Sequence, residues 1–103
     1  MMVVTHITLK PGAEPEWDAT IRERLAGART HRGWRGAQVL IPLDGPNRRV
    51  IIGSWNTRAD WEAWHEDPTF ATTRDRLCGL EAAPREMIWH EVIEDRSREA
   101  KAA

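Results

Sequence analysis

The order of the secondary-structure signals restricts the fold of this chain more than any other feature of the sequence. Four short segments are rich in β-branched residues and alternate between two faces, which is typical of strands. The expected strands are residues 3–10, 34–43, 48–55 and 85–93. Pro11-Gly12 ends the first strand, and the turn residues at 44–47 predict that the second and third strands form an antiparallel hairpin.

Apolar residues at helical spacing fill the gap between the first two strands. Trp17 and Ile21 lie four residues apart, and Pro15 stands where the first turn of a helix accepts it. We therefore expect a helix over residues 14–30. Pro42 lacks a hydrogen-bond donor, which favours an edge position for the strand that contains it.

The gap before the last strand holds two shorter helical patterns. The first carries Trp61 and Trp64 on one side, behind a polar cap. Asp67-Pro68 interrupts this pattern, and a third helix then runs to about Gly79.

The resulting order, β-α-β-β-α-β, predicts an α+β fold of the ferredoxin-like, split βαβ type. Its core is a four-stranded antiparallel sheet with the helices on one face. The 103 residues suit one domain, which we expect over residues 1–95. Residues 96–103 are charged and rich in alanine, and we expect them to form a flexible tail.

One face of this sheet is expected to lack a helical cover. The first and last strands carry apolar residues on both faces, such as Val4 beside Ile7 and Ile88 beside Trp89. Helices on one side leave half of these residues exposed, and a second copy packed about a two-fold axis covers them most simply. We therefore expect a homodimer.

The composition narrows the classes of function. Fifteen basic and sixteen acidic side chains leave a formal charge of -1, which argues against nucleic acid or a membrane surface as the main partner. Cys78 is the single cysteine, so no internal disulfide forms, and we expect it to be buried in a cytoplasmic protein. No apolar run is long enough to cross a bilayer, and no secretion signal is expected.

Six tryptophans, without a single tyrosine, are unusual in a chain of this size. Trp61 and Trp64 lie three residues apart on a helix, so their rings can line one wall. They are either core residues or stacking surfaces for a flat aromatic ligand. Trp55 at the end of the third strand is either a core residue or a catalytic one, and Phe70 is expected to close the end of such a cavity.

Two stretches of the chain resemble the antibiotic biosynthesis monooxygenase (ABM) domains. Residues 3–12 resemble the first strand and turn of the family, and residues 53–70 resemble its strand ending in tryptophan, polar cap and aromatic helix. The resemblance covers roughly residues 3–94. It implies a dimeric α+β barrel with one ligand cavity per subunit between sheet and helices.

The resemblance implies two enzymatic alternatives. Quinone-forming oxygenases of the family work on aromatic polyketides without metal or flavin, and a tryptophan and an asparagine near the substrate are implicated. Trp55 matches that tryptophan, whereas Ile51 and Ile52 stand where the asparagine is expected.

Haem-degrading members have an asparagine on the first strand, a tryptophan on the second helix and a proximal histidine on the next helix. Trp64 matches the tryptophan. His6 or Ile7 stands at the strand position, and residues 72–74 are Thr, Thr and Arg, so the haem-binding histidine has no counterpart there.

Three functions stay open on this basis. The first is a cofactor-independent monooxygenase, an oxidoreductase, or a related modifier of a small aromatic, polyketide-like molecule. Its expected catalytic residues are His6, as the base, and Trp55. The residues expected to bind the substrate are Trp61, Trp64, Phe70 and Arg74, with Arg74 at the anionic end.

The second function is a haem-binding, haem-degrading monooxygenase with haem as cofactor, and the third is a non-catalytic dimeric ligand-binding protein. No metal site built from side chains is expected, because His6 and His90 could pair on adjacent strands but lack a third ligand. His31 and His65 are expected to face water.

Overall fold

The computed structural model describes residues 1–96, and its element order is the one that the sequence predicts. The elements are β1 (Met2–Thr8), α1 (Glu14–Ala28), β2 (Trp34–Leu40), β3 (Arg48–Trp55), α2 (Arg58–His65), α3 (Pro68–Cys78) and β4 (Glu86–His90). The expected tail beyond residue 96 lies outside the described residues.

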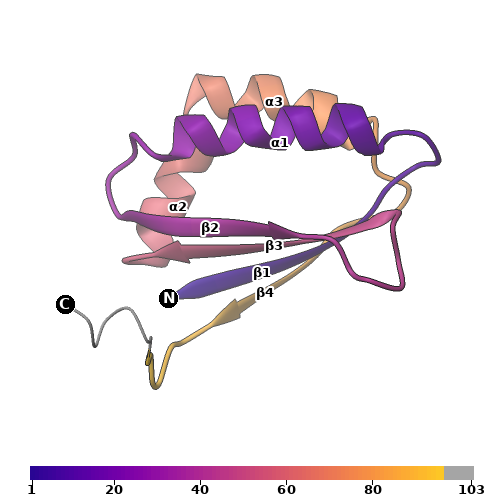
Figure 1. Ribbon diagram of the computed structural model, residues 1–103. Coiled ribbons are helices and arrows are strands. Elements are labelled where there is room, and N and C mark those ends of the chain that lie inside the picture. Colours follow the sequence, from indigo (N-terminus) through magenta and orange to yellow (C-terminus); the bar gives the residue numbers. More distant parts are fainter. Residues whose placement is uncertain (97–103) are drawn as a thin grey trace.

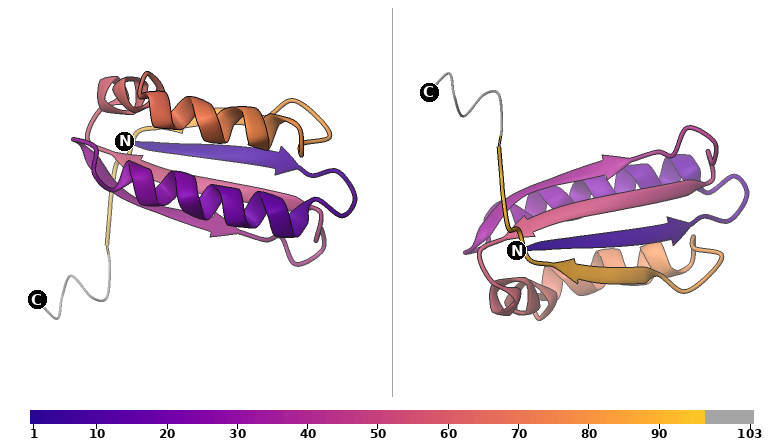
Figure 2. Two further views of the ribbon diagram at one scale, coloured as in Figure 1. Left: turned by 90° about the horizontal axis from the view of Figure 1, so that it is seen from above. Right: turned by 90° about the horizontal axis from the view of Figure 1, so that it is seen from below.

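The four strands form one antiparallel sheet in the order β2-β3-β1-β4, as the split βαβ arrangement requires. Figure 1 shows all the helices of the described chain on one face of this sheet. Seen from above, α1 and α3 run side by side across the sheet, and α2 lies at one end (Figure 2, left). The edge position predicted for the strand before Pro42 is confirmed, because β2 pairs with β3 alone.

Three strands are shorter than the sequence predicts. β2 ends at Leu40 and not at residue 43. β1 and β4 are shorter because a strand lasts only as long as its partner. β4 ends at His90, which lies opposite Met2, the first residue of β1. β1 ends at Thr8, although Leu9 still forms an isolated bridge with Glu81. The apolar run after His90 therefore has no strand to pair with.

Two clusters of buried side chains fill the space between the sheet and the helices. The first joins Trp17 and Ile21 of α1 to Leu77 of α3, and all three are almost fully buried. The second contains Trp55, Trp64 and Phe70 with part of α1. Its members come from β3, α2 and α3, so the aromatic residues meet only in the folded chain.

Side-chain caps define the break between α2 and α3. The Thr57 hydroxyl accepts a hydrogen bond from the amide of Asp60 at 3.1 Å, as the polar cap signal predicts. The carboxylate of Asp67 accepts one from the amide of Thr69 at 2.8 Å, and Pro68 begins the new helix. This break turns the chain so that Trp64 and Phe70 come together.

The other face of the sheet has no helical cover within residues 1–96 (Figure 2, right). Val4 of β1 lies there, paired with Ile52 of β3 on one side and with Ile88 of β4 on the other. Ile88 is 54% exposed. An apolar strip therefore runs across this bare face, and the homodimer stays a prediction.

Two further expectations concern the burial of Cys78 and membrane-spanning segments. Cys78 is exposed rather than buried, because it is the last residue of α3 and lies outside the buried stripe of Phe70, Thr73 and Leu77. Within residues 1–96, no helix is both long and apolar enough to cross a membrane.

Candidate functional site

A narrow hollow lies between the helix-facing side of the sheet and the helices α1 and α2. Its walls contain Trp34, Trp55, Trp61, Trp64 and Phe70. The cavity itself is small, with a volume of about 50 Å³. A ligand of several rings therefore enters only if side chains at the rim move.

Trp55 and Trp64 form the inner wall of this hollow. Their rings are stacked with centroids 5.3 Å apart, and Phe70 meets Trp64 edge-on at 4.8 Å. All three are buried. The two interpretations of these residues are therefore compatible, because the same rings belong to the core and line the hollow.

Trp61 forms the rim. It is half-buried, its ring meets the edge of Trp89 from β4 at 5.1 Å, and its other neighbour is the imidazole of His65 at 3.6 Å. Because it is only partly covered, Trp61 is the indole that moves most easily when a ligand enters.

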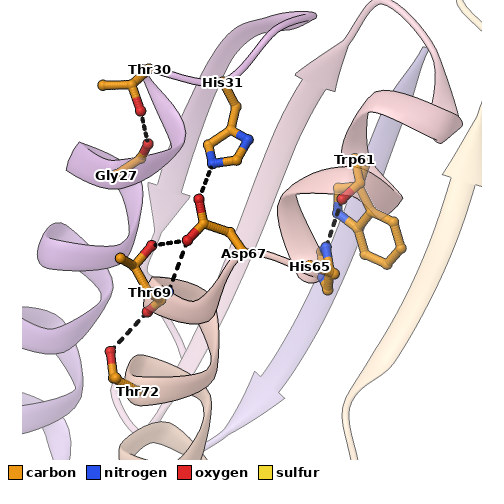
Figure 3. Close-up of polar contacts among 8 residues, drawn as sticks. All are labelled: Gly27, Thr30, His31, Trp61, His65, Asp67, Thr69 and Thr72. Carbon is orange, nitrogen blue, oxygen red and sulfur yellow. Dashed lines mark hydrogen bonds and ion pairs between the residues drawn. The ribbon is translucent and has the colours of Figure 1, made fainter.

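His65 lies in the wall of the hollow and not in water, which corrects the expectation from its acidic neighbours. The residue stands one helical turn after Trp61 and so shares its face of α2. Its Nδ1 atom lies 2.8 Å from the carbonyl oxygen of Trp61 (Figure 3). A carbonyl only accepts, so Nδ1 carries the proton and Nε2 keeps its lone pair.

The pKa of His65 is lowered to about 4, chiefly by burial and also by the positive charges of Arg24, Arg85 and Arg74, against the opposing hydrogen bond to Trp61. The imidazole is therefore neutral at neutral pH. A neutral imidazole with a free lone pair in an aromatic hollow can accept a proton from a ligand.

Arg24 brings a positive charge into the same wall. It is 6% exposed, its Nε donates to the hydroxyl of Thr73 at 3.0 Å, and its guanidinium lies 3.9 Å above the Phe70 ring. The pKa of Arg24 is lowered to about 10, chiefly by burial and next by the positive charge of Arg85, while Glu81 raises it. The group still carries its charge at neutral pH.

His6 is not part of this hollow. Its neighbours Thr5 and Ile7 point toward the helices, so His6 lies exposed on the bare face opposite Val50 and Glu86. The structure therefore does not bring the expected base to the aromatic residues.

Arg74 is also displaced from its expected position. The buried stripe of α3 runs through Phe70, Thr73 and Leu77, which leaves Arg74 exposed at its edge beside Asp75 at 3.7 Å. Of the expected site residues, the structure brings together Trp55, Trp61, Trp64 and Phe70; it leaves out His6 and Arg74.

Two functional candidates, Arg24 and His65, escaped sequence reasoning although a signal existed for each. Arg24 lies three residues after Ile21 and four before Ala28, inside the apolar stripe of α1. His65 lies four residues after Trp61. A charged or titratable residue at a stripe position indicates a buried polar group, and only its partners remain to be found.

The two strand histidines do not form a metal site. His6 pairs with Glu86 while His90 pairs with Met2, so four residues, or roughly 13 Å, separate them along the sheet. Within residues 1–96, no three His, Cys, Asp or Glu side chains gather as they would around a metal ion.

Comparison with known proteins identifies the family. The sequence pattern of the antibiotic biosynthesis monooxygenase family matches residues 1–76. The chain belongs to the ABM family. The four-stranded antiparallel sheet with helices on one face is thus the ABM fold.

Known relatives of this ABM chain include proteins of two kinds. A haem oxygenase (mycobilin-producing) from Mycobacterium tuberculosis is 24% identical over 97% of this chain and 95% of its own length. SnoaB from Streptomyces nogalater, a cofactor-independent oxygenase, has a similar fold with a TM-score of 0.77, 18% identity, and coverage of 91% of this chain and 96% of its own.

A structure from Nitrosomonas europaea, provisionally assigned to the antibiotic biosynthesis monooxygenases, has a TM-score of 0.85 at 21% identity. The match covers 89% of this chain and 88% of that one. At such identities the structural likenesses establish the fold and leave the reaction open.

Proposed function

We propose that this ABM chain is a cofactor-independent monooxygenase, or a related modifier, of a small aromatic, polyketide-like molecule. One observation carries the proposal: a neutral imidazole, that of His65, lies in a hollow walled by Trp55, Trp61 and Trp64. The indoles offer stacking surfaces to flat rings. The imidazole offers a proton acceptor beside them.

The first chemical step is proton transfer from an acidic C–H or O–H of the ligand to Nε2 of His65. This leaves a delocalised anion on the ligand and an imidazolium on the protein. The pKa of free His65 is low, but the attraction between these two new charges is strong in a water-poor hollow and offsets the difference. The cations Arg24 and Arg85 also stabilise the ligand anion.

The second step consumes oxygen and needs no protein electron carrier. The anion gives one electron to O₂, and the two radicals combine to form a C–O bond, which makes a peroxide on the ligand carbon. The peroxide anion takes the proton back from the imidazolium of His65, which restores the neutral imidazole. Loss of water then breaks the O–O bond and the remaining C–H bond of that carbon, and leaves a carbonyl. Anthrone and O₂ give anthraquinone and water in this way, with one atom of the O₂ molecule in each product. The ligand is oxidised and O₂ is reduced.

The experiment follows O₂ uptake and anthraquinone formation from anthrone. We expect His65→Gln to lower the enzymatic rate by about 100-fold, the effect of losing a general base. His6→Gln is the matched control because His6 lies on the bare face, and its rate should equal that of the wild type. A wild-type rate no faster than buffer, or an unchanged rate in His65→Gln, contradicts the oxygenase.

A non-catalytic ligand-binding protein is the outcome if aromatic molecules bind but no product forms. Trp61→Ala and Trp64→Ala should weaken ligand binding whether the protein is an enzyme or a non-catalytic binding protein, since both indoles line the hollow. Product analysis alone separates the enzyme from the binding protein.

Haem degradation is the second candidate function, because the mycobacterial relative matches along 97% of this chain and Trp64 lies in the hollow. The residues present do not fit haem at the expected position. Thr73 is buried and holds Arg24, and Arg74 points to solvent, so neither supplies a ligand to iron. The narrow hollow also leaves no room for a macrocycle without rearrangement.

Titration with haemin tests this candidate directly. We expect no shift of the Soret band beyond that seen with an unrelated protein. A shifted Soret band, followed by loss of the haem spectrum after a reductant is added, would replace the first proposal with this one.

The bare sheet face supports a homodimer as the form in which the protein acts. Val4, Ile52 and Ile88 together present an apolar strip to solvent in the single chain. A self-complementary contact about a two-fold axis buries the same strip on both copies. Sedimentation at micromolar concentration tests this, with a stable single chain as the contrary result.

A further inference from the structure

One nitrogen of Arg24 is a buried donor without an acceptor. Nη2 is inaccessible to solvent and has no hydrogen-bond partner among residues 1–96. The neighbouring Nε donates to Thr73, so the side chain is held in place while one end of its fork stays free. Leaving a buried charged donor unpaired is unfavourable, and proteins normally avoid it.

The charges around Arg24 do not supply the missing partner. Arg85 and Glu81 form a two-pronged pair at 2.8 and 2.7 Å, and the Glu81 carboxylate also accepts from Trp17. Glu23, one residue before Arg24, turns outward to Arg76 at 2.8 Å. Every nearby carboxylate is thus committed to another cation.

Two further groups complete the surroundings of Arg24. Arg74 adds a positive charge from α3 but lies in solvent beside Asp75, and the exposed thiol of Cys78 is the remaining titratable neighbour. Across the hollow, His65 is neutral. The wall therefore carries one positive charge that no group in the described chain balances.

The position of this charge indicates what would balance it. Arg24 lines the same hollow as the indoles, and its guanidinium lies over Phe70. A flat ring that stacks in the hollow would therefore bring a substituent to the guanidinium. A guanidinium binds an ionised oxygen best, and most strongly when two N–H groups point at it.

We propose that the hollow takes an aromatic ligand with a single negative charge, and that Arg24 binds the ionised oxygen of that ligand. The inference rests on the proposed function only in that the hollow is the ligand site. Carboxylate and ring-oxygen anions share this chemistry, so the probes include one of each. Arg24 takes the role that the sequence suggested for Arg74, which is to bind the anionic end of the ligand.

Calorimetry with a matched pair of probes tests the proposal. 2-Naphthoate and 2-naphthamide have the same rings and nearly the same shape, but only the first is charged. We expect the wild type to bind the naphthoate at least about tenfold more tightly. Arg24→Met should remove this preference and leave the amide affinity unchanged, because methionine fills similar space without charge.

Two controls separate charge from structure. Arg22→Met changes an exposed arginine two residues before Arg24 on α1 and should keep the preference for naphthoate. Arg24→Lys should keep part of it, since the charge remains but the fork does not. A nitro-substituted 2-naphthol, which is ionised near neutral pH where Arg24 keeps its charge, shows whether a ring oxygen replaces the carboxylate. Each variant is first shown to be folded by its circular dichroism.

The outcomes are distinct. Equal binding of naphthoate and naphthamide by the wild type, or no binding of either at millimolar concentration, overturns the anion site. A preference that survives in Arg24→Met also overturns it. A charge preference without oxygen uptake from anthrone keeps the anion site and rejects the oxygenase, whereas uptake without a charge preference does the reverse.

Discussion

The Nε2 atom of His31 lies 2.7 Å from Oδ2 of Asp67, and this contact joins the loop after α1 to the start of α3 (Figure 3). The same carboxylate accepts hydrogen bonds from the amide and hydroxyl of Thr69. His31 was expected in solvent at a helix end, and this contact corrects that expectation. Asp67 thus holds the corner between Trp64 and Phe70.

Removing this corner should destabilise the protein. We expect Asp67→Ala to lower the Tm by several degrees, because α3 loses its cap and α1 loses its tie to α3. Asp75→Ala is the control, since the contact of Asp75 with Arg74 on α3 is exposed to solvent. Thermal unfolding followed by circular dichroism makes the comparison. Equal Tm changes in the two variants would contradict the role of the corner.

The lowered pKa of Asp67 predicts that the protein loses stability at low pH. The amide and hydroxyl of Thr69, and then His31, hold the pKa of Asp67 below 3.8, its ordinary value. A carboxyl with a lowered pKa in the folded state adds stability above pH 3.8, and this is lost as pH falls through the folded pKa. The difference in Tm between the wild type and Asp67→Ala should therefore shrink below pH 3.8.

His65 should make the protein less stable in mild acid. Its pKa is about 4 in the folded state and 6.5 when unfolded, so between these values the unfolded chain binds more protons. The free energy of unfolding therefore falls as pH drops from 6.5 to 4. We expect a loss of roughly 1–2 kcal/mol, which discounts the full linkage because the ring is partly exposed.

Urea unfolding at pH 7 and pH 4.5 measures this loss, and an imidazole titration by NMR gives the pKa itself. His65→Gln should show a flatter pH dependence than the wild type. An ordinary imidazole titration near pH 6.5 for His65 would show that the ring is solvated and would contradict the predicted loss.

Two buried arginines should respond in opposite ways when they are truncated. Arg24 lacks a counterion, so Arg24→Met removes an uncompensated buried charge and should raise the free energy of unfolding by about 1 kcal/mol. Arg49 forms a two-pronged pair with Asp18 at 2.9 and 3.0 Å and also donates to backbone carbonyls.

Arg49→Met should therefore cost about 2–3 kcal/mol, since it leaves Asp18 and two carbonyls without a donor. The pKa of Arg49 is raised, chiefly by the hydrogen bond to Asp18, which agrees with a well-satisfied charge. Urea denaturation of both variants makes the comparison. A loss of stability in Arg24→Met would mean that its contacts with Thr73 and Phe70 outweigh the cost of burying the charge.

The bare face can be tested with one charge. Ile88 is 54% exposed in the single chain, so Ile88→Lys should leave the monomer folded and shift a dimer toward monomer by at least tenfold in Kd, an order-of-magnitude estimate for a buried charge. Leu43→Lys is the control, because Leu43 is fully exposed in the turn after β2. Analytical ultracentrifugation measures both. Identical association of the two variants would remove this face from the interface.

The fold could be predicted from the sequence because each element carries its own periodicity. The alternation in residues 3–9 separates Val3 from Val4, and the helical spacing of Trp17 and Ile21 marks the buried stripe of α1. The meeting of Trp55, Trp64 and Phe70 was also expected, because the family resemblance puts a cavity between sheet and helices.

Tertiary structure decided which face of the sheet is covered and which groups surround the polar residues of the hollow. Alternation tells that His6 and Thr5 point opposite ways, but only the packing of α1 and α3 on the sheet decides which side is covered. Arg24 and His65 acquire their shifted pKa values from burial and from charges on other elements. Sequence periodicity describes directions within one element, whereas solvent exclusion and unbalanced charge arise between elements that are distant along the chain.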